Sequence, residues 1–286
     1  MRRLGFLFVA VFVVLLVVGF TKKGIYSNKL GINVVVVGDL DVSLVLIRPL
    51  EGMMTWVRLP QNLSVRIFKT GAVYPLSSLW KYGVSEHNAY QIVGKSLSNT
   101  LGVLLPRVVK VKGLSTPENL LGVLHKIGMQ SDLSVRDRIA FRRDLVTSVS
   151  SKKYFEVDIP SAAIDIKADP DGKEFLEINS VINLWTKNKF VFDTLLGENS
   201  NVKVRNLTSV NGAGLLLSRQ LESAGLRVVE VTAGSGEKFS GTGCVFRSIG
   251  GHEYTDYLLT NYSGCRNITT KEDKKSGADG VEVWIL

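Results

Sequence analysis

The chain has 286 residues, with 35 Lys and Arg against 26 Asp and Glu and a formal net charge of +9. With 45% hydrophobic and 21% charged residues, it is expected to form one or two globular domains, and a highly charged disordered chain is excluded. Two cysteines exclude a disulfide-rich miniprotein and a four-cysteine zinc site, and three widely separated histidines offer no pair spaced for a metal. The positive charge favours an anionic partner without identifying it.

The first 23 residues have the pattern of a membrane-spanning segment. The 17 residues from Leu4 to Phe20 are uncharged, with two arginines before them and two lysines after them. A helix of this length spans about 26 Å, close to the ~30 Å hydrocarbon core of a bilayer. The run ends in Gly-Phe-Thr-Lys-Lys and not in a small-x-small cleavage site. We therefore predict an uncleaved signal anchor at residues 1–23, whose equal flanking charges do not set its orientation.

Residues 24–200 are expected to form an α/β layered domain, because strand-like and helix-like segments alternate along this part of the chain. Strands are predicted where apolar runs are bounded by turn residues, at 31–38, 41–47, 53–59, 107–112 and 175–178. Helices are predicted from apolar residues at helical spacing, at 85–101, 117–127 and 135–150. Ser85 and Thr116 are the expected N-caps of the first two helices. Residues 190–201 are expected to be a connector.

Residues 201–286 are expected to form a small second α/β domain of two βαβ units. The predicted strands lie at 202–207, 226–231, 243–248, 265–269 and 281–286, and the predicted helices at 212–224 and 252–262. Cys244 and Cys265 fall on the two strands of the second unit. Since such strands are commonly neighbours, the two cysteines can form a disulfide, although two buried free thiols are an equally good prediction. A disulfide would indicate an oxidising compartment.

Residues 201–286 also resemble the C-terminal domain of the LytR-CpsA-Psr (LCP) cell-envelope family. The resemblance is carried by VKVRNLTSVNGAGLLLSRQLESAGLRVVEV near the start of this segment and by ADGVEVWIL at its end. In the first motif, Asn206 stands in the turn after the strand, Gly212 and Gly214 open the helix and Gly225 ends it. The order of these elements supports the resemblance more than any single residue does.

Residues 31–113 resemble, more weakly, the start of the LCP catalytic domain. The family's Gly-Asp turn after a buried strand corresponds to residues 38–39, and its Asn-Ala-Tyr helix start corresponds to residues 88–90. The resemblance implies a signal anchor at 1–23, a degenerate LCP-like α/β domain with a connector at 24–200, and a LytR-type C-terminal domain at 201–286. Residues 114–200 are expected to complete the first domain, because 31–113 alone has too few helices to cover both faces of a sheet.

The resemblance implies a membrane-anchored protein with its domains outside the bacterial cytoplasm. Members of the family transfer glycopolymers from a polyprenyl-pyrophosphate carrier to the cell wall, using arginines, aspartates and a divalent cation around the pyrophosphate. In this chain Asp39 stands at the position of the first arginine, Gln-Asn at residues 61–62 replaces an Arg-Asp pair, and only Asp41 is retained. Neutral side chains cannot stabilise the charge that develops on phosphoryl oxygens.

We therefore expect a non-catalytic binding or scaffolding member of the family that recognises an anionic wall polymer or a polyprenyl-linked glycan, without a cofactor or metal. One alternative is a divergent phosphotransferase, in which Asp41, Mg²⁺ and the arginines of segment 136–143 rebuild the pyrophosphate site. Another is a structural envelope protein that docks a protein partner through its C-terminal domain. Nucleic acid is not an expected partner, since the positive charge belongs to the anchor and to residues 24–150.

The candidate ligand-binding residues are Asp41, Arg138, Arg142 and Arg143. Arg138 and Arg142 share one side of a predicted helix and could form an anion-binding face, although a solvated helix face has the same pattern. Asp41 is the only retained candidate for a catalytic residue, and with Asp39 it could equally form a turn at a strand end. No Ser-His-Asp triad is indicated, because the histidines lie far from any nucleophile motif.

Overall fold

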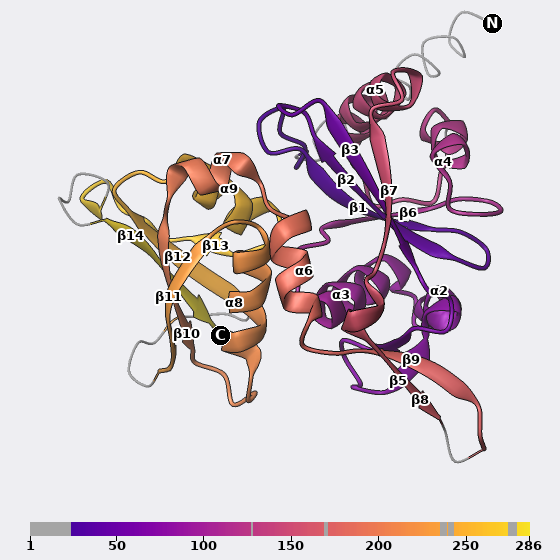
Figure 1. Ribbon diagram of the computed structural model, residues 1–286. Coiled ribbons are helices and arrows are strands. Elements are labelled where there is room, and N and C mark those ends of the chain that lie inside the picture. Colours follow the sequence, from indigo (N-terminus) through magenta and orange to yellow (C-terminus); the bar gives the residue numbers. More distant parts are fainter. Residues whose placement is uncertain (1–23, 127, 169–170, 235–238, 240–242, 274–278) are drawn as a thin grey trace, which may run out of the picture.

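The computed structural model describes residues 24–286 except 127, 169–170, 235–238, 240–242 and 274–278. Two five-stranded sheets form the centres of two α/β bodies that lie side by side (Figure 1). The mixed α/β class expected from the sequence is confirmed. The predicted signal anchor at 1–23 lies outside the described residues. In the part of the chain that the structure describes, no helix combines the length and the apolar character needed to cross a bilayer.

The sheet of the N-terminal body has the strand order β6-β1-β2-β3-β7. Its strands are β1 (Ile32–Val37), β2 (Val42–Arg48), β3 (Met53–Leu59), β6 (Arg107–Lys110) and β7 (Tyr154–Asp158). β1, β2 and β3 form an antiparallel meander, in which Gly52 provides the φ of +60° for the second turn. β6 pairs in parallel with β1, and β7 pairs in parallel with β3. The segment 114–200 therefore supplies one edge of the first sheet.

Helices cover both faces of this sheet. One face packs against α2 (Leu76–Ser85) and α3 (Ala89–Leu101), and the other against α4 (Pro117–Leu124) and α5 (Val135–Ser150). Val35 of β1 belongs to the core on the α2 and α3 side, whereas Val34 and Val36 belong to the core on the α4 and α5 side. Because successive strand side chains point to opposite faces, a strand that is covered on both sides is almost wholly apolar.

The start of the predicted helix at 85–101 is wrong. Ser85 is the last residue of α2, and its hydroxyl donates to the carbonyl oxygen of Tyr82 over 2.7 Å. His87 has a φ of +53°, which breaks the helical path, and α3 begins only after Asn88. The predicted N-cap at Thr116 is confirmed, because its hydroxyl oxygen accepts from the backbone N–H of Asn119. The helix ends at Leu124, three residues before its predicted end, and Ile127 itself lies outside the described residues.

The sheet of the C-terminal body has the strand order β11-β10-β14-β12-β13. Its elements are β10 (Asn201–Asn206), α8 (Ala213–Ser223), β11 (Arg227–Ala233), β12 (Cys244–Ile249), α9 (Glu253–Asn261), β13 (Arg266–Asn267) and β14 (Gly280–Ile285). β10 and β11 are parallel, and so are β12 and β13, so both predicted βαβ units are present. β14 joins them by pairing in parallel with β10 and antiparallel with β12.

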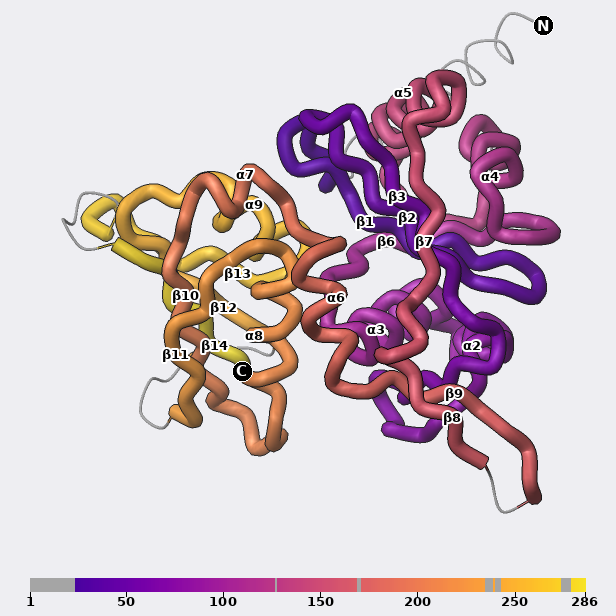
Figure 2. Tube along the Cα trace, in the orientation of Figure 1, coloured from indigo at the N-terminus to yellow at the C-terminus, as the bar shows by residue number. Residues whose placement is uncertain are grey.

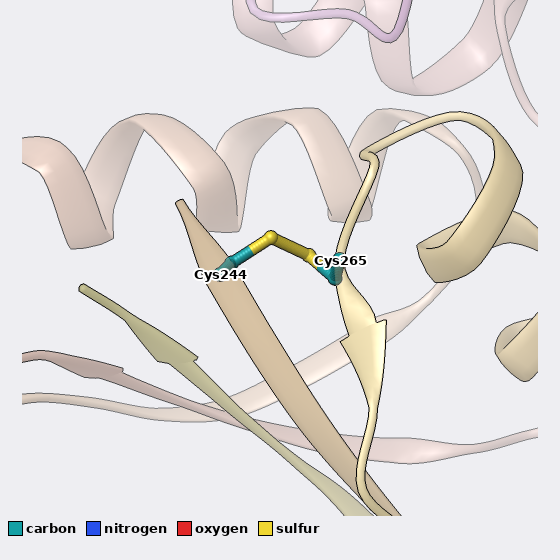
Figure 3. Close-up of a disulfide and its surroundings, with 2 residues drawn as sticks. All are labelled: Cys244 and Cys265. Atoms are coloured by element: carbon teal, nitrogen blue, oxygen red, sulfur yellow. A yellow bond between two sulfur atoms is a disulfide. The ribbon is translucent and has the colours of Figure 1, made fainter. Parts of the chain in front are cut away.

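Cys244 and Cys265 form a disulfide in the C-terminal body (Figure 3). The bond links β12 to the residue just before β13. β12 and β13 are parallel neighbours in the sheet. Of the two outcomes that the sequence left open, the structure has the disulfide.

The strand predicted at 175–178 is confirmed as β9 (Glu174–Ile178). Other short elements were not predicted from the sequence: the strands β4 (Ser64–Arg66), β5 (Val73–Pro75) and β8 (Ile164–Ala168), a 3-10 turn (Ser161–Ala163), and the helices α6 (Ile182–Lys189) and α7 (Asp193–Glu198). The predicted connector at 190–201 is wrong in part, because it contains α7. α6 lies between the two bodies, where it contacts α3 and α8 (Figure 2).

The two bodies share an apolar and hydrogen-bonded interface. Leu30 and Leu104 come from the N-terminal body but pack into the core of the C-terminal body, where they are 1% and 4% exposed. Arg48 of β2 donates to the carbonyl oxygens of Phe190 and Val191 over 3.0 Å each, and its guanidinium lies 4.0 Å from the ring centre of Phe192, which belongs to the core of the C-terminal body. Burial of Arg48 lowers the pKa of its guanidinium to about 10. These contacts hold the bodies in one arrangement.

Candidate functional site

The turn between β1 and β2 borders a cavity of about 230 Å³, which we call the strand-end pocket. Its lining residues come from this turn, from α2 and from β6: Val37, Gly38, Asp39, Leu40, Asp41, Val42, Leu76, Ser77, Trp80, Lys81 and Lys110. The turn requires glycine at position 38, because a Cβ there would lie 2.8 Å from both the carbonyl oxygen of Gly113 and the backbone nitrogen of Ser115. The pocket thus lies where two loops approach each other closely.

The carboxylate of Asp41 is bound by the second of these loops. Its Oδ1 accepts from the backbone N–H of Ser115 over 2.9 Å, and its Oδ2 accepts from the Ser115 hydroxyl over 2.8 Å. Ser115 is 4% exposed, so these bonds are partly shielded from water. The structure gives Asp41 the role of joining the β1–β2 turn to the loop before α4.

Asp39 has a similar role on the exposed side of the turn. Its carboxylate forms an ion pair with Lys110 over 2.7 Å and accepts from the backbone N–H of Gly113 over 2.6 Å. The hydrogen bond from Lys110 is the main cause that lowers the pKa of Asp39 below its usual range, followed by the bond from Gly113. Lys110 Nζ also donates to the carbonyl oxygen of Gly38 over 2.6 Å, so this ammonium group binds two consecutive residues of the turn.

The donor set of the strand-end pocket does not fit a Mg²⁺ ion. Mg²⁺ prefers carboxylate oxygens that are free to coordinate in an octahedral shell. Here both oxygens of Asp41 accept from Ser115, and an ammonium group lies 2.7 Å from Asp39. Within the described ranges, no group of three or more His, Cys, Asp or Glu side chains is placed to hold a metal.

The predicted arginines do not join Asp41. They lie on α5, which packs on the opposite face of the sheet from α2 and the strand-end pocket (Figure 1). Arg138 donates to the carbonyl oxygens of Leu124 and Lys126, over 3.1 and 2.9 Å. Arg143 donates to its neighbour Asp144 over 2.7 Å, and Arg142 is exposed. These arginines therefore form a separate face.

A larger cavity of about 700 Å³, which we call the interdomain groove, lies between the two bodies. Its lining residues are Phe68, Asn88, Tyr90, Gln91, Gly94, Lys95, Ser98, Asn99, 104–108, Asp132, Ala213, Leu216, Leu217, Gln220, Gly243, Cys244, 261–264 and Ile285. One wall comes from α3 and the chain leading into β6, and the other from α8 and the chain after α9. Sequence analysis did not predict this groove, because even the lining residues of the two walls that are nearest in the chain, Asp132 and Ala213, are 81 residues apart.

Hydrogen bonds join the two walls of the interdomain groove. Gln220 Nε2 of α8 donates to Ser98 Oγ over 3.1 Å and to Asn99 Oδ1 over 3.3 Å, both on α3. The buried hydroxyl of Tyr262 donates to the carbonyl oxygen of Gly31 over 2.5 Å. A ligand in the groove would meet walls that are already fixed relative to each other.

Charged groups line one wall of the interdomain groove. The Lys95 ammonium lies 4.5 Å from the centre of the Phe68 ring, and Arg107 lies at the start of β6. Burial raises the pKa of Asp132 to about 6, against the opposing effects of the Val108 N–H and of Arg107. This wall therefore carries two cations and one acid that is only partly ionised near pH 6, beside many neutral amides.

Ser200, His252 and Asp279 come together in the C-terminal body, although the sequence indicated no triad. Ser200 Oγ lies 2.7 Å from His252 Nδ1, and His252 Nε2 lies 2.7 Å from Asp279 Oδ1. Ser200 is 0% exposed, so its hydroxyl is closed to a substrate. Glu198 accepts from the backbone N–H of Thr255 over 2.8 Å at the start of α9. The group therefore fixes α7, α9 and β14 to one another and is structural.

No protein-family model matches the chain. No curated protein matches it either. A crystal structure of Bacillus subtilis TagT is 13% identical with a TM-score of 0.42, and the match covers 58% of this chain and 92% of the TagT chain. TagT with bound octaprenyl pyrophosphate lipid, described as a LytR-CPS2A-psr family protein, is 14% identical with a TM-score of 0.39, covering 57% and 89%. A transcriptional regulator from Enterococcus faecalis is 10% identical with a TM-score of 0.40, covering 53% and 82%.

The solved structures to which the chain is similar include members of the LytR-CpsA-Psr family.

Proposed function

We propose that this protein is a non-catalytic, membrane-anchored binding protein of the bacterial cell envelope, which holds an anionic glycopolymer or a polyprenyl-linked glycan in the interdomain groove. The observation that carries the proposal is a cavity of about 700 Å³ between the two bodies, with two cations on one wall. Ligand sites often lie between domains and have volumes of about 300–1,000 Å³. The groove is also large enough for several sugar units.

The lining of the groove suits such a ligand. Lys95 and Arg107 can each donate to a phosphate or carboxylate, and charge-assisted bonds of this kind are among the stronger polar contacts. Amide side chains such as Asn99 and Asn261 can donate to and accept from sugar hydroxyls. Leucine side chains on the opposite wall offer apolar contact to sugar rings or to a lipid. The groove therefore provides charge, hydrogen bonds and apolar surface together.

The non-catalytic part of the proposal is supported by the strand-end pocket. The resemblance to the LCP family would place pyrophosphate chemistry there, with arginines and a cation. In this chain both carboxylates are bound by neighbouring loops, and the candidate arginines lie on the other face of the sheet. Lys81 in the lining can bind an anion, but among the described residues the pocket lacks the arginines and the free carboxylates that the resemblance would place around a pyrophosphate.

Two observations support the envelope location. The apolar run before Lys22 has the length of a membrane anchor, and the Cys244–Cys265 disulfide is of the kind that persists in oxidising compartments. Together they favour an orientation with the two bodies outside the cytoplasm.

Binding can be tested with full-length protein in detergent micelles and purified wall teichoic acid as the probe. The variant K95Q/R107Q is expected to weaken binding at least tenfold, because each lost charge-assisted bond is worth more than about 1 kcal/mol. The matched control K69Q/K173Q removes the same charge from exposed sites outside the groove and is expected to bind like the wild type. Equal binding by K95Q/R107Q and the control contradicts the groove as the site.

The same preparation tests catalysis. A polyprenyl-pyrophosphate-linked glycan is incubated with the protein, Mg²⁺ and a peptidoglycan acceptor, and the polyprenyl monophosphate that is released when the glycan phosphate is transferred is measured. No turnover above the protein-free control is expected. Turnover that is abolished by D41A would instead support the phosphotransferase alternative and would rule out the non-catalytic proposal.

A further inference from the structure

The first described residues are held against α5. The backbone N–H groups of Ile25 and Tyr26 both donate to Asp137 Oδ1, over 2.8 and 2.7 Å. Asp137 lies in the first turn of α5 and is 0% exposed. A buried carboxylate that accepts two backbone bonds is a strong clamp, because breaking those bonds would leave a charge without partners in a buried site.

The clamp begins at the first described residue. A Cβ built on Gly24 would lie 2.9 Å from Asp137 Oδ1 and 3.4 Å from the Cβ of Arg136. Farther along, the hydroxyl of Tyr26 is hydrogen-bonded to Asp144, and Arg143 donates to the side-chain oxygen of Asn28 over 3.2 Å. Residues 24–28 therefore run beside α5.

The position of this clamp fixes how far α5 can be from a membrane that holds the predicted anchor. The apolar run ends at Phe20, and three residues, Thr21 to Lys23, separate it from Gly24. The four residue steps from Phe20 to Gly24 reach about 14 Å at most when fully extended. The headgroup region on each side of a bilayer is about 5–8 Å thick. The start of α5 must then lie at or just above the headgroups.

The exposed side of α5 has the composition of a membrane-contacting surface. Arg136, Ile139 and Arg143 follow each other at helical spacing on this side, and Arg142 lies next to Ile139. All four are exposed, and Ile139 is 62% exposed although it is a large apolar residue among arginines. Arginines beside an exposed aliphatic side chain suit the boundary between anionic headgroups and acyl chains.

We propose that this α5 face, formed by Arg136, Ile139, Arg142 and Arg143, rests on the bilayer and binds the headgroups of anionic phospholipids. The proposal rests on the membrane anchorage included in the proposed function. The α5 face sets the orientation of the N-terminal body, while β8 and β9 at its opposite end point away from the membrane (Figure 1). It also gives two of the three predicted ligand-binding arginines, Arg142 and Arg143, a phospholipid surface as partner, whereas Arg138 is bonded to the carbonyl oxygens of Leu124 and Lys126.

The proposal is tested with the full-length chain in nanodiscs of phosphatidylcholine alone or of phosphatidylcholine and phosphatidylglycerol at about 3:1. Both native cysteines are in the disulfide, so I139C provides one thiol for an environment-sensitive NBD label. We expect a blue-shifted and at least twofold stronger NBD emission in the anionic nanodiscs. A label at D171C, in the turn between β8 and β9, is expected to show water-like emission in both.

Charge variants are then made in the I139C background. R136Q/R142Q is expected to reduce the anionic response at position 139 by at least half, whereas K69Q/K173Q, which removes the same charge elsewhere, leaves it unchanged. Arg136, Arg142, Lys69 and Lys173 are all exposed, so both double variants are expected to give the far-UV circular dichroism spectrum of the I139C parent. R142Q alone is expected to give an intermediate response.

Three results would overturn the inference. The emission at position 139 could be the same in neutral and anionic nanodiscs, or R136Q/R142Q could respond like K69Q/K173Q. In either case the protein is still found in the nanodisc fraction, so the membrane anchorage stands and only the binding of lipid by the α5 face is contradicted. A chain that stays outside the nanodiscs overturns the membrane anchorage together with the α5 face, which separates the two failures.

Discussion

Asp132 shows how one buried acid can make the stability of this protein depend on pH. Its Oδ1 accepts from the backbone N–H of Val108 over 2.7 Å, and the group lines the interdomain groove. Burial raises its pKa to about 6 from the ordinary aspartate value of 3.8. Between these two pH values the folded state therefore binds more protons than the unfolded state, and stability falls as the pH rises.

We predict that D132N removes this part of the pH dependence. Asn keeps the acceptor for Val108 but cannot ionise. Relative to the variant, the wild type should lose on the order of 3 kcal/mol of unfolding free energy between about pH 4 and pH 7, since each pKa unit is worth about 1.4 kcal/mol. Urea unfolding of full-length protein in non-ionic detergent at pH 4, 5, 6 and 7 measures the difference. Parallel curves for the two proteins would mean that Asp132 does not titrate in this range.

The turn between β1 and β2 could be predicted from the sequence, but the residues that bind its carboxylates could not. Gly38 and Asp39 after a β-branched run indicate a turn at the end of a buried strand, and the structure has that turn. The partner of Asp41 is Ser115, which is 74 residues farther along. Only the parallel pairing of β6 with β1 brings the two loops together. Whether Asp41 binds a ligand or a loop therefore depends on a contact that no local pattern contains.

At the scale of elements, the disulfide closes the second βαβ unit. Cys244 and Cys265 are 21 residues apart, and the closed loop contains all of α9. Cross-linking a loop of this length removes entropy from the unfolded chain, which amounts to about 3 kcal/mol in the chain-entropy model. The bond therefore stabilises β12, α9 and β13 as one unit.

We predict that C244A/C265A lowers the unfolding free energy of the C-terminal body by about 3 kcal/mol. Thermal unfolding followed by near-UV circular dichroism measures the loss. Adding a reductant to the wild type should produce a similar loss, while the same reductant should leave the variant unchanged. A variant as stable as the untreated wild type would show that the bond contributes nothing to folding.

Two kinds of helix were not predicted from the sequence. One kind is too short to repeat an apolar spacing, and the other directly adjoins a second helix with a similar apolar spacing. α7 has six residues, so it completes fewer than two turns and shows no repeated apolar spacing. α2 carries Leu76 and Leu79 at helical spacing, but it is followed at once by α3 with a similar pattern. A single turn at His87 separates them, and its positive φ is not evident from residue type. Long elements with strong patterns, such as α5 and β1, could be predicted nearly to their ends.

At the scale of the molecule, Leu104 is the residue that couples the two bodies. It lies in the chain between α3 and β6, yet it packs into the core of the C-terminal body with Phe192 and Tyr262. In the sequence it belongs to an apolar run at 103–105 that could equally have filled the core of its own body. The interface, and the interdomain groove beside it, therefore follow from long-range packing and could not be predicted locally.

We predict that L104A uncouples the unfolding of the two bodies. Truncating a buried leucine costs about 2–5 kcal/mol, and here the loss falls on the contact between the bodies. Calorimetry of the full-length protein should show one transition for the wild type and two for L104A, with the C-terminal body unfolding first because its core loses the side chain. L79A makes the same truncation within the core of the N-terminal body and should lower the transition temperature without separating it. A single transition for L104A, shifted as much as that of L79A, would show that Leu104 stabilises the molecule without coupling its halves.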